Sequence, residues 1–484
     1  MKKTISLLGV CIMLVLFSST TIAQESELKG QIEQFMKESL EEYQIPGASL
    51  AIVQGEKVIF QENWGKQSNG KEITNNTLFT IGSISKPITS LAIMKLVEEG
   101  KIDLDTSIHS YLPSFHYDKG NAKNEITIRH LLSHTSGISS YEGLKVADQK
   151  LRGKDAIKKA TEMLNGVKLN KDPGRMHQYS AANYLLLGRV IEEVSKTSYA
   201  QYMENEIFTE LRMDHSVSDF KKAIKLGYEP GYQAWFGKPI KSSNHFDDSG
   251  SPYGYIASTS SDMIQFISFI LGKQNFLGQK YFTEYTSPQI HRKEVFYYGL
   301  GWRISTKEDD SYLFHGGETP DSRAELFIHP SKQYGFILLT NKNNVSDVMH
   351  TTYIKEGIRS IIEKNSAPKI ISADHKLQWI TLFFVIITLF FSLVLLFHLM
   401  KQKTITLRHR LIGCIYLVVG LSIIPTLESV FNTPWRTITM YGSDIAILTR
   451  CFITICILVS LFIFYQEYKI RSIMNKNMKS FFKK

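Results

Sequence analysis

Residues 78–105, LFTIGSISKPITSLAIMKLVEEGKIDLD, decide how the rest of this 484-residue chain is interpreted. They predict the end of a strand, a tight turn and a long helix that ends at Gly100. Ser83 and Lys86 stand three residues apart at the start of this helix, so their side chains share one face. A serine becomes nucleophilic when a neighbouring base takes its proton, and a lysine is such a base where burial or charge lowers its pKa. The N–H groups of a helix N-terminus can also stabilise an oxyanion.

Serine and lysine at this spacing occur six times in the chain, so the spacing alone indicates little. The six pairs begin at Ser26, Ser68, Ser83, Ser218, Ser366 and Ser480. Only Ser83 stands between a strand-like segment, residues 78–81, and a strongly periodic helix. The alternative is that Ser83 caps the N-terminus of the helix, which is a common role of serine.

Strand-like segments stand near both ends of the region between residues 26 and 360, and helical patterns fill its middle. Residues 47–65 predict two strands around a turn. Four further strand-like segments are 296–305, 311–317, 324–330 and 334–341. Residues 26–43 predict a helix whose apolar face comprises Ile32, Phe35, Met36 and Leu40. We therefore expect an α+β fold, in which the two ends build one antiparallel sheet flanked by helices, with a helical subdomain beside it.

Two further segments carry residues suited to catalysis in the cleft of such a fold. Tyr179 precedes an apolar helix, and its phenol could exchange protons if a cation kept it ionised, or could simply anchor that helix. His315, Gly316 and Gly317 lie within a strand. Because glycines let another backbone approach closely, this strand could bind a substrate by β-addition, with His315 as a polar or cationic group. A turn at the end of the strand is the alternative.

The histidines show no spacing typical of a metal site. His130 and His134 are four residues apart, but no glutamate stands where a zinc-binding H-E-x-x-H helix requires one. The segment that contains them, TIRHLLSHTSGI, predicts instead a helix that Gly137 ends.

Taken together, the motifs resemble those of the penicillin-recognising serine hydrolases, a family that includes class C β-lactamases, D-alanyl-D-alanine carboxypeptidases and related esterases. The resemblance covers residues 28–360 and includes the segments FTIGSISKPIT, HLLSHTSGI, NYLLLG and HGGETP. It implies a β-lactamase/DD-peptidase-like fold with an antiparallel sheet of five strands, and a site that needs no metal or cofactor.

The resemblance also implies a role for each candidate residue. Ser83 would be the acylated nucleophile, and Lys86 and Tyr179 would share the proton transfers. The strand that holds His315 would bind the substrate, and the N–H groups of Ser83 and Glu318 would form the oxyanion hole. The substrate-binding and oxyanion set is Ser83, Gly316, Gly317 and Glu318.

The chain departs from the family's pattern in two places. In YSAANYLLLG, residues 179–188, Ala181 replaces an asparagine that hydrogen-bonds the catalytic lysine and the substrate amide, and alanine can do neither. His315 begins an H-G-G motif where the best-known members have K-T-G. The second change is common among the family's peptidases and esterases, and it argues against an efficient β-lactamase.

Apolar segments at both ends of the chain indicate export and a membrane anchor. Residues 1–23 have the basic start, short apolar run and small residues of a signal peptide. Residues 371–484 predict a membrane region with three spans, at about 377–400, 411–427 and 445–465. Basic residues gather between the first two spans and in the C-terminal tail, which places both in the cytoplasm. The domain at residues 24–370 would then lie outside it.

The net charge of +10 follows from this topology, because the basic residues gather in the cytoplasmic pieces and in the signal peptide. It therefore gives no indication of nucleic-acid binding.

Three functions fit these observations. The first is a membrane-anchored serine hydrolase that acts through a Ser83 acyl-enzyme on a peptide-like amide, such as a D-amino-acid peptide or a cell-wall precursor. This plan resembles that of certain membrane-anchored penicillin-binding-related proteins of Gram-positive bacteria. The second is a prodrug-activating D-peptidase of a natural-product pathway. The third is a penicillin-binding-like module weakened by Ala181, which the retention of Ser83 together with Lys86 disfavours.

Overall fold

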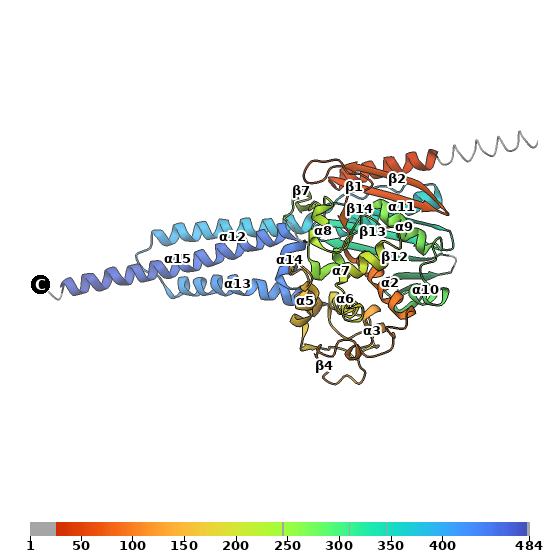
Figure 1. Cartoon of the computed structure of the whole chain (residues 1–484). Coiled ribbons are helices and arrows are strands. Elements are labelled where there is room, and N and C mark those ends of the chain that lie inside the picture. Colours follow the sequence, from red (N-terminus) through yellow and green to blue (C-terminus); the bar gives the residue numbers. More distant parts are fainter. Residues whose placement is uncertain (1–25, 244–245, 309, 346, 482–484) are drawn as a thin grey trace, which may run out of the picture. The chain divides into compact units, whose positions relative to one another are not determined.

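The computed structural model describes residues 26–243, 246–308, 310–345 and 347–481, so the predicted signal peptide lies outside the described residues. The chain divides into two compact units (Figure 1). The larger unit comprises residues up to 233 together with 239–373. The smaller unit comprises residues 234–238 together with 374–484.

An antiparallel sheet of eight strands forms the larger unit's centre, in the order β2-β1-β14-β13-β12-β11-β10-β9 (Figure 1). The strands are β1 (Gly47–Gln54), β2 (Lys57–Gly65), β9 (Pro288–Lys293), β10 (Phe296–Gly299), β11 (Arg303–Lys307), β12 (Asp310–Thr319), β13 (Ser322–His329) and β14 (Tyr334–Thr340). The expected number of five strands is wrong. Residues 296–305 form two strands rather than one, because Gly301, with a φ of +86°, turns the chain between β10 and β11. β9 adds a further strand by pairing with β10.

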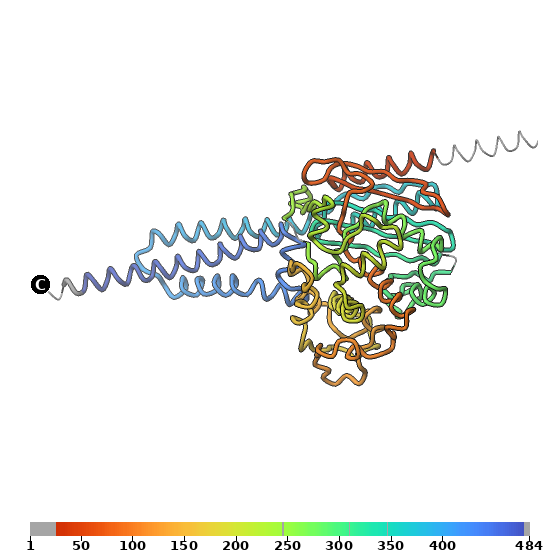
Figure 2. Tube along the Cα trace, viewed as in Figure 1, coloured from red at the N-terminus to blue at the C-terminus, as the bar shows by residue number. Residues whose placement is uncertain are grey.

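The two ends of this unit's chain meet within the sheet, as its second and third strands, β1 and β14. β1 pairs with β14 from Ala48 opposite Thr340 to Gln54 opposite Tyr334. Figure 2 shows these strands side by side although they are far apart in the sequence. Every residue of β13 and β14 is buried, as expected for strands that are covered on both faces. The expectation that the two ends build one sheet is confirmed.

Apolar side chains pack on both faces of the sheet. One core contains the helix at residues 26–42 and α11 (Val348–Lys364), and the expected apolar face of the first helix is buried there. The larger core contains the helices from the middle of the chain. Among them, α2 (Ser85–Glu98) and α6 (Ala181–Ser195) are buried along most of their length. The other α-helices of this unit are α3 (Ile128–Leu132), α4 (Ser140–Val146), α5 (Ala156–Leu164), α7 (Tyr199–Tyr202), α8 (Phe220–Lys225), α9 (Ser260–Ile270) and α10 (Gln279–Thr286).

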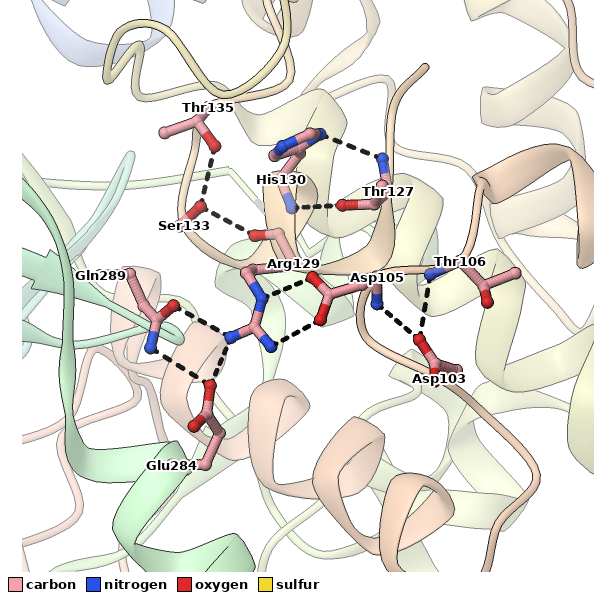
Figure 3. A network of polar contacts seen from close by, with 10 residues as sticks. All are labelled: Asp103, Asp105, Thr106, Thr127, Arg129, His130, Ser133, Thr135, Glu284 and Gln289. Atoms are coloured by element: carbon pink, nitrogen blue, oxygen red, sulfur yellow. Dashed lines mark hydrogen bonds and ion pairs between the residues drawn. The ribbon is translucent and has the colours of Figure 1, made fainter. Parts of the chain in front are cut away.

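Arg129 ties α3 to the end strand of the sheet (Figure 3). Its guanidinium donates to both carboxylate oxygens of Asp105, at 2.7 and 3.0 Å. It also bonds to Glu284 on α10 and donates to Gln289 on β9 at 3.0 Å. The hydrogen bonds from Arg129 hold the pKa of Asp105 below its usual range. Since Arg129 stands one turn before His134, this network fixes the chain that leads to that residue.

Long apolar helices make up most of the smaller unit. α12 (Lys376–Met400), α13 (Leu407–Phe431) and α15 (Ser443–Phe481) are long and apolar enough to cross a membrane, and α14 (Trp435–Tyr441) is a short helix before α15. Only 11% of the most apolar window of α12 is buried, which suits a surface that lipid covers. α15 continues past the expected end at residue 465, because residues 466–481 contain no glycine or proline to end the helix.

The turn between β12 and β13 contains a buried carboxyl group whose ionisation we expect to weaken the fold. Asp321 is 1% exposed, and its Oδ2 has no hydrogen-bond partner among the described residues. Burial raises the pKa of Asp321 to about 6. Because the pKa of an unfolded aspartate is about 3.9, the group favours folding below that pH and loses this contribution as the pH rises through 6.

We expect Asp321→Asn to stabilise the protein at high pH only. The neutral amide removes the cost of ionisation, so the free energy of unfolding should rise by up to about 3 kcal/mol at pH 8 and be unchanged at pH 4. Thermal unfolding of the detergent-solubilised protein at the two pH values measures this, with the exposed Asp214→Asn as the control. A lower melting temperature at pH 8 would contradict the prediction.

Candidate active site

Ser83 lies in a tight turn between a short strand and a buried helix. β3 (Phe79–Thr80) is followed by one 3₁₀ turn, Gly82–Ile84, and then by α2. Gly82 has a φ of +54°, and a Cβ there would lie 2.0 Å from the backbone nitrogen of Glu318, so glycine is required. The strand, turn and helix expected here are confirmed. The Ser83 side chain caps neither helix, so its alternative role as a helix cap is wrong.

Lys86 lies beside the Ser83 hydroxyl in an environment from which water is excluded. The lysine is 2% exposed, its Nζ lies 2.9 Å from Ser83 Oγ, and it donates to the carbonyl oxygen of Tyr253 at 2.7 Å. Burial lowers the pKa of Lys86 well below its usual value, and the charge of Arg303 lowers it further. A neutral amine in this position can accept the proton of the hydroxyl group.

Tyr179 faces the same lysine from the segment before α6. Lys86 Nζ lies 4.7 Å from the centre of the Tyr179 ring. Burial raises the pKa of Tyr179 to about 12, although the charge of Arg303 opposes this. The Ser83 side chain also acts on the phenol and opposes this rise in pKa. The phenol is therefore protonated at neutral pH, so the condition set in the sequence analysis, a cation that keeps it ionised, is not met. Among the described residues, Tyr179 Oη forms no hydrogen bond of normal geometry.

Residues 315–318 of β12 pass beside the Ser83 turn. β12 pairs with β13 there, whereas its pairing with β11 ends at Phe314. Within the part of the chain that the structure describes, residues 315–318 thus keep one unpaired edge, as β-addition of a substrate requires. Burial, followed by the charge of Arg303, lowers the pKa of His315 well below its usual value. The ring is therefore neutral rather than cationic.

The two glycines of this strand have different neighbours. A Cβ on Gly317 would lie 1.9 Å from the carbonyl oxygen of Ile81 and 3.2 Å from the backbone nitrogen of Ser83. A Cβ on Gly316 would instead lie 3.2 Å from a carboxylate oxygen of Glu325. Gly317 therefore allows the strand to touch the turn that carries Ser83.

The sequence interpretation missed Arg303, a cation whose charge acts on Lys86, Tyr179 and His315. Its guanidinium carbon lies 5.8 Å from the centre of the Tyr179 ring, and its Nε is buried without a hydrogen-bond partner among the described residues. Its charge lowers the pKa values of Lys86 and His315. The register offered a signal, since Arg303 begins β11 and lies opposite Phe314, next to the H-G-G motif. A half-buried guanidinium with an unused donor is suited to an anionic substrate group.

Ala181 begins α6 and offers no side-chain acceptor to Lys86. The next asparagine, Asn183, cannot replace the missing one, because it is fully buried and engaged elsewhere. Its Oδ1 accepts from Ser136 Oγ at 2.6 Å, and its Nδ2 lies 2.8 Å from His134 Nδ1. The polar contacts of Lys86 described here are therefore those with the Ser83 hydroxyl and with a backbone carbonyl.

Three possible metal ligands gather away from this site, namely Asp310, His329 and Glu363. Arg359 donates to Asp310, and Lys332 pairs with Glu363 at 3.1 Å. Side chains already supply the positive charge that these carboxylates require, so we assign no metal to them.

The profile of the beta-lactamase family matches residues 32–358 of the chain. The chain belongs to the beta-lactamase family. Protein flp of Staphylococcus aureus strain N315 is 29% identical over 326 residues, which are 66% of this chain and 64% of flp. Penicillin-binding protein 4 of Amycolatopsis lactamdurans is 27% identical over 229 residues, which are 46% of this chain and 59% of that protein. The matched regions thus span less than two thirds of either relative.

Solved structures of the family have the same fold. The octameric penicillin-binding protein homologue from Pyrococcus abyssi superposes with a TM-score of 0.61 at 23% identity, over 69% of this chain and 77% of that one. A class C beta-lactamase superposes with a TM-score of 0.59 at 20% identity, over 71% of this chain and 98% of that one. The hydrolase EstCE1, with promiscuous acyltransferase activity, superposes with a TM-score of 0.58 at 19% identity, over 66% of this chain and 94% of that one. The family resemblance inferred from the sequence is confirmed.

We expect Gly317→Ala to separate β12 from the Ser83 turn. Its Cβ would meet backbone atoms, so covalent labelling by a penicillin should slow by about 100-fold or more and the melting temperature should fall. Gly316→Ala is the matched control, because its Cβ would meet only the end of a side chain and should cost less than about tenfold. The two variants are compared by the rate of labelling with a fluorescent penicillin. Equal rates would contradict the assignment.

Proposed function

We propose that this protein is a membrane-anchored serine hydrolase that cleaves peptide-like amides through an acyl-enzyme on Ser83. The observation that carries the proposal is the 2.9 Å contact between Ser83 Oγ and a buried Lys86 whose pKa is lowered. This pair supplies both the nucleophile and the base. It favours an enzyme over a binding module, since a binding role would not need a dry, neutral lysine beside the hydroxyl.

In the proposed mechanism, Lys86 takes the proton of Ser83 as Oγ attacks the substrate carbonyl. The N–H groups of Ser83 and Glu318 hold the negative oxygen of the tetrahedral intermediate. The C–N bond then breaks, Tyr179 gives its proton to the leaving nitrogen, and the Lys86 ammonium restores the tyrosine proton. Water attacks the ester next, Lys86 accepts a proton from that water, and the proton returns to Ser83 as the acid leaves.

The substrate we propose is a peptide with a free carboxylate near the scissile amide, such as a D-amino-acid peptide or a cell-wall precursor. The cation Arg303 supports this choice, because its Nε is unpaired beside Tyr179. The unpaired edge of β12 would bind the peptide backbone in an extended conformation. The name of one relative, penicillin-binding protein 4, is consistent with the same chemistry. A prodrug-activating D-peptidase would use the same groups.

We further propose that the hydrolase domain lies outside the cytoplasm and the C-terminus within it. Support comes from the signal-peptide pattern of residues 1–23, the three apolar helices, and the basic residues gathered in residues 401–410 and in the tail.

We expect Ser83→Ala to abolish covalent labelling. The wild-type protein should gain the mass of one acyl group from a reactive β-lactam or a fluorophosphonate, and mass spectrometry should place it on Ser83. Ser366→Ala is the matched control, because Ser366 has a lysine at the same spacing but is exposed. Labelling of neither protein, or equal labelling of Ser83→Ala and wild type, would refute the serine mechanism.

We expect Arg303→Gln to change substrate preference. The ratio of kcat/KM for a peptide with a free C-terminal carboxylate to that for its amide should fall by about 10- to 100-fold, the usual value of a charged hydrogen bond. Arg303→Lys keeps the charge and should give an intermediate ratio. A parallel loss on both substrates would mean that Arg303 acts only by lowering the pKa of Lys86.

A further inference from the structure

The turn after α3 contains a histidine where the backbone favours glycine. The N–H of His134 donates to Leu131 O at 3.3 Å, and the N–H of Thr135 donates to His130 O at 2.8 Å. These two bonds form a Schellman motif, in which the residue at the position of His134 adopts a left-handed conformation. His134 has a φ of +58°, a conformation that is less favourable for a residue with a Cβ than for glycine.

The ring of His134 is held in one tautomer. The backbone N–H of Ser180 donates to His134 Nδ1 at 3.3 Å, so Nδ1 carries no proton. Asn183 Nδ2 donates to the same nitrogen at 2.8 Å, and Ser136 Oγ donates to Asn183 Oδ1 at 2.6 Å. The relay from Ser136 through Asn183 therefore places the proton of the neutral ring on Nε2. It also joins the two family segments HLLSHTSGI and NYLLLG.

The His134 ring lies against Tyr179, which the proposed mechanism uses for proton transfer. Its centre is 4.3 Å from the centre of the Tyr179 ring and 5.0 Å from that of Tyr298. His134 is fully buried, and its Nε2 has no hydrogen-bond partner among the described residues. Burial, followed by the charge of Lys86, lowers the pKa of His134 well below its usual value, so the ring is neutral.

A turn that only had to end α3 would be served better by glycine or asparagine, which tolerate the left-handed conformation. The strained backbone of His134 and the relay from Ser136 through Asn183 both fix the position of the His134 ring. We propose that His134 is a positioning residue for the proton transfer, which holds the ring of Tyr179 over Lys86 and leaves the tyrosine hydroxyl free for the leaving group. This proposal rests on the proposed acylation of Ser83.

His134→Asn tests the proposal, because asparagine keeps the turn and removes the ring. Acylation of the full-length protein in detergent is followed by stopped flow with a fluorescent penicillin over a range of concentrations. The limiting acylation rate constant should fall by roughly tenfold or more, while the half-saturating concentration stays within about twofold. An unchanged rate constant in a folded variant, or a loss confined to the half-saturating concentration, would overturn the positioning role.

Ser136→Ala decides the matter if His134→Asn does not fold. It removes the outer hydrogen bond of the relay, together with the bond that Ser136 Oγ accepts from the N–H of Ile138 at 3.1 Å, and it should lower the acylation rate constant by about threefold or more. Ser133→Ala is its matched control, because Ser133 Oγ donates to Arg129 O at 2.7 Å and lies outside the relay. Equal rates for the two variants overturn the proposal. A wild-type protein that is not acylated at all refutes the proposed function instead.

Discussion

The contact between Lys86 Nζ and Ser83 Oγ, made in a dry core, is the interaction on which the rest of the site depends. A charged lysine could not be buried there without a large desolvation cost, so the pKa falls and the amine becomes a base. Several elements of the site contribute to the burial and the contacts of Lys86. α2 carries the lysine through the apolar core, Tyr253 supplies a carbonyl acceptor, and Arg303 adds a cation that favours the neutral amine further.

The second constraint is the close approach of two backbones. Gly82 and Gly317 each lack a Cβ that would collide with the opposing chain, and the turn and the strand therefore touch. β12 can pass there because its pairing with β11 stops at Phe314, which leaves the edge of residues 315–318 unpaired. In the proposed mechanism, the same geometry both places an N–H group beside Ser83 and leaves an edge of β12 for a substrate strand. The absence of a Cβ at Gly82 and Gly317 makes this close approach possible. At Ala181, in contrast, the short side chain removes a polar contact that asparagine would make.

Local patterns were sufficient for part of this structure. The strand, turn and helix around Ser83, the apolar face of the helix at residues 26–42, and the meeting of the two chain ends follow from periodicity, turn residues and strand pairing. The family resemblance supplied the order of the motifs but predicted too few strands. The six strand-like segments of the sequence become eight strands because Gly301 divides one segment and β9 adds a strand. Arg303 and His134 were missed because their roles arise from register and packing. Neither residue carries a local pattern that reveals which distant residues it contacts in the folded core. The pKa of Tyr179 likewise depends on burial, which residue spacing does not reveal.

The pH dependence of Ser83 acylation tests the central claim most directly. If Lys86 is the base and burial keeps it neutral, the limiting rate constant for acylation by a reactive β-lactam reaches its plateau well below pH 10.5, the usual pKa of lysine. A rate constant that keeps rising through pH 10.5, as it would for a solvated lysine, would contradict the account.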